Sequence, residues 1–279
     1  MHYKQLIFII FLLLIGTLPS RQSMAQENFE VRQVAFRGNK TLEEDFLLER
    51  MALKEVSWLE KVLTKNEPFL YNEKLVKVDV ERLTRIYQSQ GFLKVDVQLQ
   101  PLKVREKKET IKITFKIEEG EPVKIDTVTL ELFENTESIN LDSLRNKLLK
   151  ELVLKQGDRF RDEAIKNDKQ TIDNAFRSLG YAYANTSYSL DLDIDEMTTE
   201  IHFSVYPGPK AYVGETSISG NDHVSSKFIR KQLQYEEGEL YNKSLLNETR
   251  ENLYRLQLFR VVSVLPEKNA QSGRSPIPV

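Results

Sequence analysis

The stretch Ile86-Tyr87-Gln88-Ser89-Gln90-Gly91-Phe92 occurs in related form three times in this chain. The second copy is Ala175-Phe176-Arg177-Ser178-Leu179-Gly180-Tyr181, and the third is Leu253-Tyr254-Arg255-Leu256-Gln257-Leu258-Phe259. Each copy ends an amphipathic helical pattern and runs into a β-prone stretch. The interval of roughly 80 to 90 residues is too long for a solenoid repeat and fits a very small α/β domain. The sequence therefore predicts three tandem small domains.

The N-terminus has the pattern of an export signal. His2 and Lys4 precede an apolar run, residues 6–15, which is shorter than the ~20 apolar residues that a membrane-spanning helix needs. Small residues follow at Ser23 and Ala25, the two positions recognised at a cleavage site. We expect a signal peptide over residues 1–25, with an uncleaved membrane anchor as the alternative.

Composition excludes several classes of protein. The chain of 279 residues has no cysteine, so disulfides and zinc or thiol chemistry based on cysteine are excluded. With 40 Lys and Arg against 42 Asp and Glu, the formal net charge is −2, which gives no electrostatic footprint for nucleic acid. A hydrophobic content of 40% with 29% charged residues suits small domains with thin cores.

The first repeat, residues 29–121, predicts the order strand, helix, helix, strand, strand. A capping-box pattern at Thr41-Leu42-Glu43-Glu44 opens its first helix, and Gly91 ends the second because glycine readily adopts the left-handed conformation. Apolar residues at helical spacing, or alternating with polar ones, mark the other elements. The expected ranges are a strand at 29–36, helices at 42–51 and 72–90, strands at 94–100 and 111–117, and a charged turn at 105–109.

The second repeat, residues 122–209, follows the same order. The third, residues 210–266, is predicted to have helices near 225–234 and 244–256 and a strand at Arg260–Leu265, but it lacks its last strand. Aligned by its aromatic residue, this repeat has Leu258 where the other two have glycine. The tail, residues 267–279, contains Pro and Ser and is expected to be disordered.

These units resemble the polypeptide-transport-associated (POTRA) domains of BamA- and TamA-type outer-membrane assembly factors. The resemblance rests on Phe36-Arg37-Gly38-Asn39, Ile218-Ser219-Gly220-Asn221 and Glu237-Gly238-Glu239-Leu240-Tyr241, and on the repeated helix end. It implies an α+β fold in which each domain has a three-stranded mixed sheet with two helices on one face. It also implies a periplasmic protein associated with the outer membrane. Family members carry a C-terminal 16-stranded barrel that this sequence does not contain, so we expect a truncated member or a fragment.

The resemblance also suggests where partners bind. An exposed strand edge can accept an extended segment of another chain through backbone hydrogen bonds, with little sequence preference. In the family, the strand after the second helix is the edge used in this way. The alternative is that these strands pair only within their own sheet, with charged residues blunting the edge. The candidate residues are Lys94, Val95, Asp96, Val97, Gln98, Leu99, Ala184, Asn185, Thr186, Ser187, Tyr188, Arg260, Val261, Val262 and Ser263.

Catalytic chemistry finds no support in the sequence. His202 and His223 lie in different repeats, and a triad or a multi-histidine metal site would need both to converge. His202 is expected to be solvated, because it alternates with apolar strand neighbours. The acidic run 191–196 fails the calcium-loop pattern, because Glu196 stands where glycine is needed and His202 where glutamate is needed. We expect no enzyme, cofactor or metal site, and a charged hairpin tip at this run.

The expected function is that of a periplasmic POTRA array in an outer-membrane protein assembly factor. Expected partners are unfolded outer-membrane protein clients, accessory periplasmic or lipoprotein subunits, and the outer membrane through the barrel of the family, but not nucleic acid. A stand-alone periplasmic scaffold or spacer without client binding is the alternative.

Overall fold

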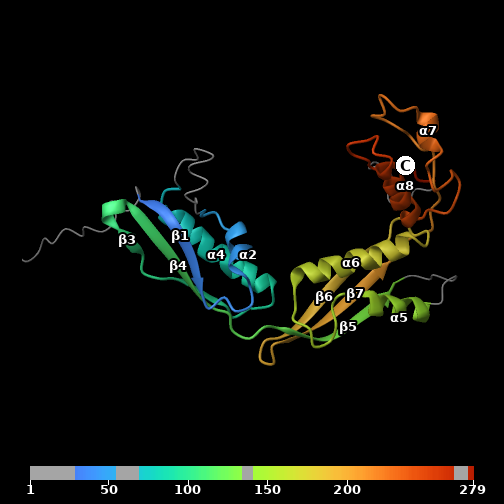
Figure 1. The fold of residues 1–279 in the computed structure, drawn as a ribbon. Coiled ribbons are helices and arrows are strands. Elements are labelled where there is room, and N and C mark those ends of the chain that lie inside the picture. The colour runs from blue at the N-terminus through green and yellow to red at the C-terminus, as the bar shows by residue number, and fades with distance from the viewer. Residues whose placement is uncertain (1–28, 55–68, 134–140, 267–275) are drawn as a thin grey trace, which may run out of the picture. The chain divides into compact units, whose positions relative to one another are not determined.

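The computed structural model describes the chain except for residues 1–28, 55–68, 134–140 and 267–275 (Figure 1). The expected signal peptide lies outside the described residues. Internal contacts divide the chain into two compact units. Unit 1 comprises residues 1–88 and 93–120, and unit 2 comprises residues 89–92 and 121–279.

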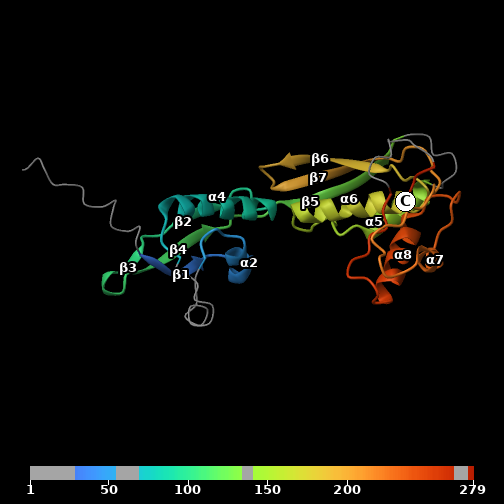
Figure 2. The ribbon, with the colours of Figure 1, turned by 90° about the horizontal axis from the view of Figure 1, so that it is seen from above.

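Unit 1 has one mixed sheet with helices on one face (Figures 1 and 2). The strand order is β1-β4-β2, with the short β3 also paired to β4, so the sheet has one strand more than the sequence indicates. β1 runs parallel to the central β4, while β2 and β3 run antiparallel to it. The elements are β1 (Glu30–Arg37), α2 (Glu44–Glu49), α4 (Glu73–Ser89), β2 (Asp96–Leu99), β3 (Lys103–Arg105), a 3-10 turn (Glu106–Lys108) and β4 (Thr110–Glu118).

The core of unit 1 follows from the period-two pattern of its central strand. Ile111, Ile113, Phe115 and Ile117 of β4 are buried, as the alternation predicts. Leu83 lies among the fully buried residues on α4, whose apolar residues recur at helical spacing. The expected elements of the first repeat are therefore present, with ends shifted by a few residues.

Unit 2 contains a second sheet of the same topology. Its order is β5-β7-β6, with β5 parallel and β6 antiparallel to the central β7. Helix α6 packs against β6 and β7, and α5 packs against β5 (Figures 1 and 2). The elements are β5 (Lys124–Leu132), α5 (Leu141–Glu151), α6 (Asp162–Arg177), β6 (Asn185–Asp193) and β7 (Thr198–Tyr206), followed by α7 (Ser226–Arg230) and α8 (Lys243–Arg255).

One backbone feature places the three repeats in a common alignment. In each repeat a residue at the expected start of the first strand forms an isolated antiparallel bridge to the residue three positions before the second helix. The three bridges are Glu30 to Leu70, Lys124 to Arg159, and Tyr212 to Leu240. The parallel pairs that follow are Val31 with Ile111, Ile125 with Thr199, and Val213 with Ile277. Residue 277 therefore lies where the central strand of the other repeats begins.

This position corrects the expectation of a disordered tail for residues 276–279. The Ile277 amide donates to the Tyr212 carbonyl over 2.8 Å, and the Val279 amide donates to that of Glu215 over 3.1 Å. Ile277 is buried in a cluster with Ala211, Val213 and Leu246, among others. Pro276 and Pro278 are compatible with this ladder, because the donors come from the residues between and after them. Residues 267–275 of the expected tail lie outside the described residues.

Two further expectations for the third repeat were wrong. Arg260–Leu265 is not a strand in the structure. Its counterparts β2 and β6 are strands because each pairs with a central strand, and of the central strand of the third repeat only the start is described. The alignment of Tyr254 with Tyr87 and Phe176 is also wrong by one residue. Leu253 is buried like Tyr87 and Phe176, whereas Tyr254 is exposed. Gln257, with φ of 55°, takes the left-handed position that glycine occupies in the other repeats.

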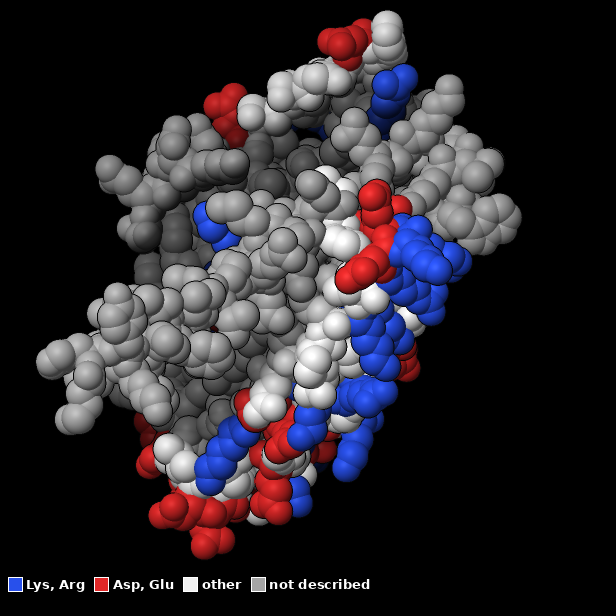
Figure 3. Space-filling model, turned by 90° about the vertical axis from the view of Figure 1, so that its left-hand side faces the viewer, with Lys and Arg blue, Asp and Glu red and all other residues white. Residues whose placement is uncertain are grey.

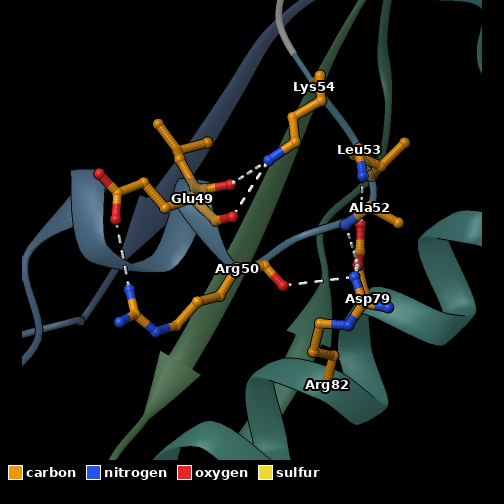
Figure 4. A network of polar contacts seen from close by, with 8 residues as sticks. Glu49, Arg50, Ala52, Leu53, Lys54, Asp79 and Arg82 are labelled. Carbon is orange, nitrogen blue, oxygen red and sulfur yellow. Dashed lines mark hydrogen bonds and ion pairs between the residues drawn. The ribbon is translucent and has the colours of Figure 1, made fainter. Parts of the chain in front are cut away.

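A buried carboxylate on the second helix holds the loop after the first helix. In unit 1 the two oxygens of Asp79 accept the backbone N–H groups of Ala52 and Leu53, both over 2.8 Å (Figure 4). Arg82 donates to the same carboxylate at 3.3 Å. The arrangement satisfies two loop donors that would otherwise be buried without a partner.

The same contact recurs in unit 2. There Asp168 accepts from Val153 over 2.6 Å and from Leu154 over 3.0 Å. In the third repeat the hydroxyl of Thr249 takes this place and accepts the Gln234 amide over 2.8 Å. The helix and the loop are thus joined in the same way in all three repeats, although the side chain differs.

Candidate strand-binding edge

The outer edge of β6 is the best candidate for binding an extended chain. β6 pairs with β7 along nine residues, from Asn185 opposite Tyr206 to Asp193 opposite Thr198. Within the described residues no other strand pairs with it, so it ends the sheet (Figure 1). In an antiparallel edge strand, alternate residues direct their N–H and C=O groups away from the partner strand. The edge therefore offers a long regular row of backbone groups.

An apolar stripe runs beside this edge. Tyr188, Leu190 and Leu192 are 43%, 42% and 39% exposed, and Ile194, in the turn that follows, is 55% exposed. Tyr188, Leu190 and Leu192 alternate along the strand and so point to one face, which they share with Phe203 and Ile201, the partners of Tyr188 and Leu190 on β7. Tyr188, Leu190, Leu192 and Ile194 are called the β6 stripe below. Large apolar side chains next to an open edge favour an added strand with apolar residues of its own.

The edge predicted in unit 1 is much less suitable. β2 has only four residues, and Pro101, which has no N–H, follows it before β3 continues along β4. Charged Asp96 and neighbouring Lys94 alternate with its apolar residues. The described surface at the β3 end of this unit mixes basic and acidic side chains (Figure 3). Short, charged and proline-interrupted strands are the usual ways in which edges are protected from pairing.

The structure places the predicted residues in three separate segments. Lys94 to Leu99 lie at β2, and Ala184 to Tyr188 lie at the start of β6. Two of the latter, Ala184 and Thr186, are fully buried, and Asn185 accepts a hydrogen bond from Lys169 over 3.4 Å. Arg260, Val261, Val262 and Ser263 lie in an irregular segment. Of the three segments, therefore, only the one on β6 belongs to a long regular edge.

Sequence reasoning missed the most exposed part of that edge. The edge was predicted to end at Leu190, so Leu192 and Ile194 lie beyond the predicted residues. The signal was present, because the segment Tyr188-Ser189-Leu190-Asp191-Leu192-Asp193-Ile194 alternates apolar and polar residues. The expected charged hairpin tip follows at residues 194–197, where Asp193 at the end of β6 accepts the backbone N–H groups of Asp195 and Glu196, each over 2.9 Å.

The two described histidines lie in different parts of unit 2. His202 on β7 makes a 2.8 Å hydrogen bond to Thr129 through Nδ1, and its Nε2 lies 3.5 Å from Glu200. His223 lies in an exposed turn before α7. Over the described residues, no group of three or more His, Cys, Asp or Glu side chains could hold a metal ion. In that same part of the chain, no helix combines the length and the apolar character needed to cross a bilayer.

Repeated mixed sheets with helices on one face, joined in tandem, define a class of small modular α+β domains. The family model of POTRA, described as surface antigen variable number repeat, matches residues 29–120, 134–208 and 211–276. Because these ranges include most of the chain, this protein belongs to the POTRA family.

Named relatives are outer-membrane protein assembly factors. The chain is 28% identical over 238 residues to outer membrane protein assembly factor BamA of Neisseria meningitidis serogroup B, covering 82% of this chain and 28% of that protein. It is 23% identical over 238 residues to BamA of Neorickettsia risticii, covering 85% of this chain and 31% of that protein. The chain thus spans less than a third of the length of these relatives.

A solved structure has the same fold. The crystal structure of Haemophilus influenzae BamA POTRA3-5 matches with a TM-score of 0.58 at 20% sequence identity. The match covers 90% of this chain and 94% of that one. At this level of identity the likeness concerns the fold alone.

Proposed function

We propose that this chain acts in the periplasm as the POTRA region of an outer-membrane protein assembly factor. In this role it binds extended segments of unfolded client chains along β6. The observation that supports this proposal most directly is the nine-residue open edge of β6, flanked by the β6 stripe. The names of the relatives support the assembly role. Backbone pairing along an edge suits many clients, because it demands little of their sequence.

Clients of this kind have a pattern that fits the β6 stripe. Transmembrane β-strands of outer-membrane proteins alternate apolar and polar residues. A strand added beside β6 would place its apolar residues next to Tyr188, Leu190 and Leu192, and its polar residues on the face of Ser187 and Ser189. Accessory periplasmic or lipoprotein subunits, and the outer membrane itself, are further proposed partners through the same assembly role.

The proposal is tested by measuring binding of fluorescent peptides copied from transmembrane β-strands. Replacing Leu190 and Leu192 together by lysine should weaken binding at least about tenfold, because each loses part of the roughly 1.5–3 kcal/mol that burying a leucine contributes. The binding should change little with salt, since the paired groups are neutral. Circular dichroism and thermal unfolding check that the variant remains folded.

Val153→Lys provides the matched control, since Val153 is also exposed, at 51%, and belongs to the same repeat but not to the β6 edge. This variant should bind within about twofold of the unchanged protein. Equal loss in both variants would indicate a general charge effect and contradict the β6 assignment. If the unchanged chain captures no peptide at all, the chain acts as a scaffold or spacer and the client-binding proposal fails.

A further inference from the structure

The open face of the unit 1 sheet, which points away from the helices, carries more basic than acidic side chains. The apolar residues of the central strand β4 are buried on the helix side, so the residues between them point outward. The register with β1, β2 and β3 places further outward residues beside these. The acidic members are Glu30, Asp96 and Glu118. The basic members, called the basic face below, are Arg37, Lys103, Arg105, Lys112 and Lys116.

Two pairs of like charge lie directly opposite each other on the basic face. Arg37 of β1 is the register partner of Lys116 on β4, and the second pair is Lys103 of β3 with Lys112 of β4. Side chains at such positions are close neighbours, and like charges there destabilise a sheet. Lys116 forms an ion pair with Glu118, whereas the other three have no ion pair over the described residues. A negatively charged partner on this face would relieve the repulsion.

The corresponding face of the second sheet has the opposite charge. On β7, Ile201 and Phe203 are buried on the helix side, so the neighbouring Glu200 points outward. Its register partner on β6 is Asp191, so the directly opposed charges here are both negative. The basic members are Lys124 and, when protonated, His202, which lies 3.5 Å from Glu200. The acidic members, called the acidic face below, are Glu131, Asp191, Asp193 and Glu200.

We infer that the basic face of one copy of this chain binds the acidic face of a second copy. The two sheets share one topology, so the side chains on both faces follow the same strand spacing and the same period of two residues. A lipid headgroup or another acidic protein would relieve the like-charge pairs of the basic face only. A second copy relieves those of both faces at once.

The contact joins two different faces, so it is heterologous. Each added copy leaves one basic and one acidic face for the next copy, which gives an open row or a closed ring. The contact uses neither the backbone groups of the β6 edge nor the β6 stripe, because the acidic face lies on the other side of that strand. The inference is therefore independent of the proposed client binding.

Analytical ultracentrifugation of the full chain measures the association. At about 0.01 M salt the weight-average mass should rise with protein concentration. At about 1 M salt it should return to the mass of one copy, because the Debye length falls from about 30 Å to about 3 Å. A mass that stays at one copy in low salt would overturn the inference, also where the two faces meet within a single chain.

Charge reversal tests which faces meet. The basic-face variant carries Arg37→Glu and Lys112→Glu, and the acidic-face variant carries Glu131→Lys and Glu200→Lys. Each should self-associate at least about tenfold more weakly in low salt, because like charges then face each other across the contact. Both variants should unfold at no lower temperature than the unchanged chain, since three of the four reversals turn like-charged cross-strand neighbours into opposite ones.

Combining the reversals tests whether the two faces bind each other. A mixture of the two variants, and a single chain with all four changes, should both associate again, because opposite charges then meet at the contact. Loss without this rescue would overturn the inference.

Lys74→Glu with Lys166→Glu is the matched control. It changes the net charge as much as the basic-face variant does, but its two residues are exposed on α4 and α6, outside both faces. This variant should associate as the unchanged chain does. Equal loss in the control and in the basic-face variant would indicate a general charge effect and contradict the assignment.

Vesicles containing anionic phospholipid test a different occupant. If they bind the unchanged chain but not the basic-face variant, while the chain stays a single copy in solution, a lipid surface is the occupant and the inference fails. The basic-face variant leaves unit 2 unaltered and should capture the transmembrane-strand peptides normally. Peptide capture and self-association can therefore fail separately.

Discussion

Asp79 and Asp168 each hold a loop through two backbone hydrogen bonds. We therefore expect them to contribute more to the free energy of unfolding than the exposed carboxylates of the same helices. Asp168→Ala would leave the Val153 and Leu154 amides without their acceptor. An unsatisfied buried donor costs about 1–3 kcal/mol, so we expect a loss of about 3 kcal/mol for the two together. Native-state hydrogen exchange at the Leu154 amide measures it. Glu163→Ala, an exposed change on the same helix, should stay within about 0.5 kcal/mol. Similar losses in both variants would contradict the prediction.

The same residue predicts a pH dependence. Burial raises the pKa of Asp168 above its ordinary 3.8, although the Val153 and Leu154 amides and the charge of Lys155 act to lower it. The folded state therefore binds the proton more tightly than the unfolded state between 3.8 and the raised pKa. Across that window the stability contributed by this group falls as pH rises. The stability difference between the unchanged chain and Asp168→Asn should fall accordingly from about pH 3 to about pH 7. A difference that grows with pH would show a lowered pKa instead.

At the scale of elements, the end of α8 carries a strain that the other two helix ends avoid. Gln257 has φ of 55°, where Gly91 and Gly180 have φ of 92° and 99°. Because a side chain at positive φ costs roughly 1 kcal/mol, Gln257→Gly should stabilise unit 2 by about 0.5–1 kcal/mol. Leu256→Gly is the control, since Leu256 has φ of −67° and gains nothing from glycine. Urea unfolding followed by a probe in the third repeat compares them, and stabilisation by both changes would contradict the explanation.

The helices and strands in which buried residues recur at a regular spacing could be predicted from the sequence. The errors lie where a single residue type, such as an aromatic residue at a helix end, indicated the wrong position. The patterns of α4, α6, β4 and β7 are strong, because buried positions recur at 3.6 or two residues. In the third repeat Tyr254 has the residue type of the buried Tyr87, but Leu253 takes the buried position. Helix α8 has 13 residues and α4 has 17, so α8 is about one turn shorter. The same face of the helix stays buried, but the number of residues from the helix start to its last buried residue changes.

For the molecule as a whole, composition misled where long-range pairing decides the structure. Pro276 and Pro278 suggested disorder, yet Ile277 completes a core to which Ala211 and Val213, more than 60 positions earlier in the chain, contribute. The strand predicted after the second helix is present as β6 and ends its sheet among the described residues, while its use as a binding edge stays a prediction. Its far end, with Leu192 and Ile194, was missed although the alternation of apolar and polar residues continues through it, because the prediction ended the strand at Leu190.

The pairing of Ile277 yields a prediction about how unit 2 is held together. Ile277→Ala removes a fully buried side chain from the cluster around Val213 and Leu246, and such changes cost about 2–5 kcal/mol. The Gly214 and Ser217 amides, which donate to the tail, should lose hydrogen-exchange protection. The Val31 amide, which donates to the Phe69 carbonyl, should keep its protection, because both residues belong to unit 1 and Ile277 belongs to unit 2. Unchanged protection at Gly214 and Ser217 would mean that residues 276–279 do not occupy the start of the central strand in solution.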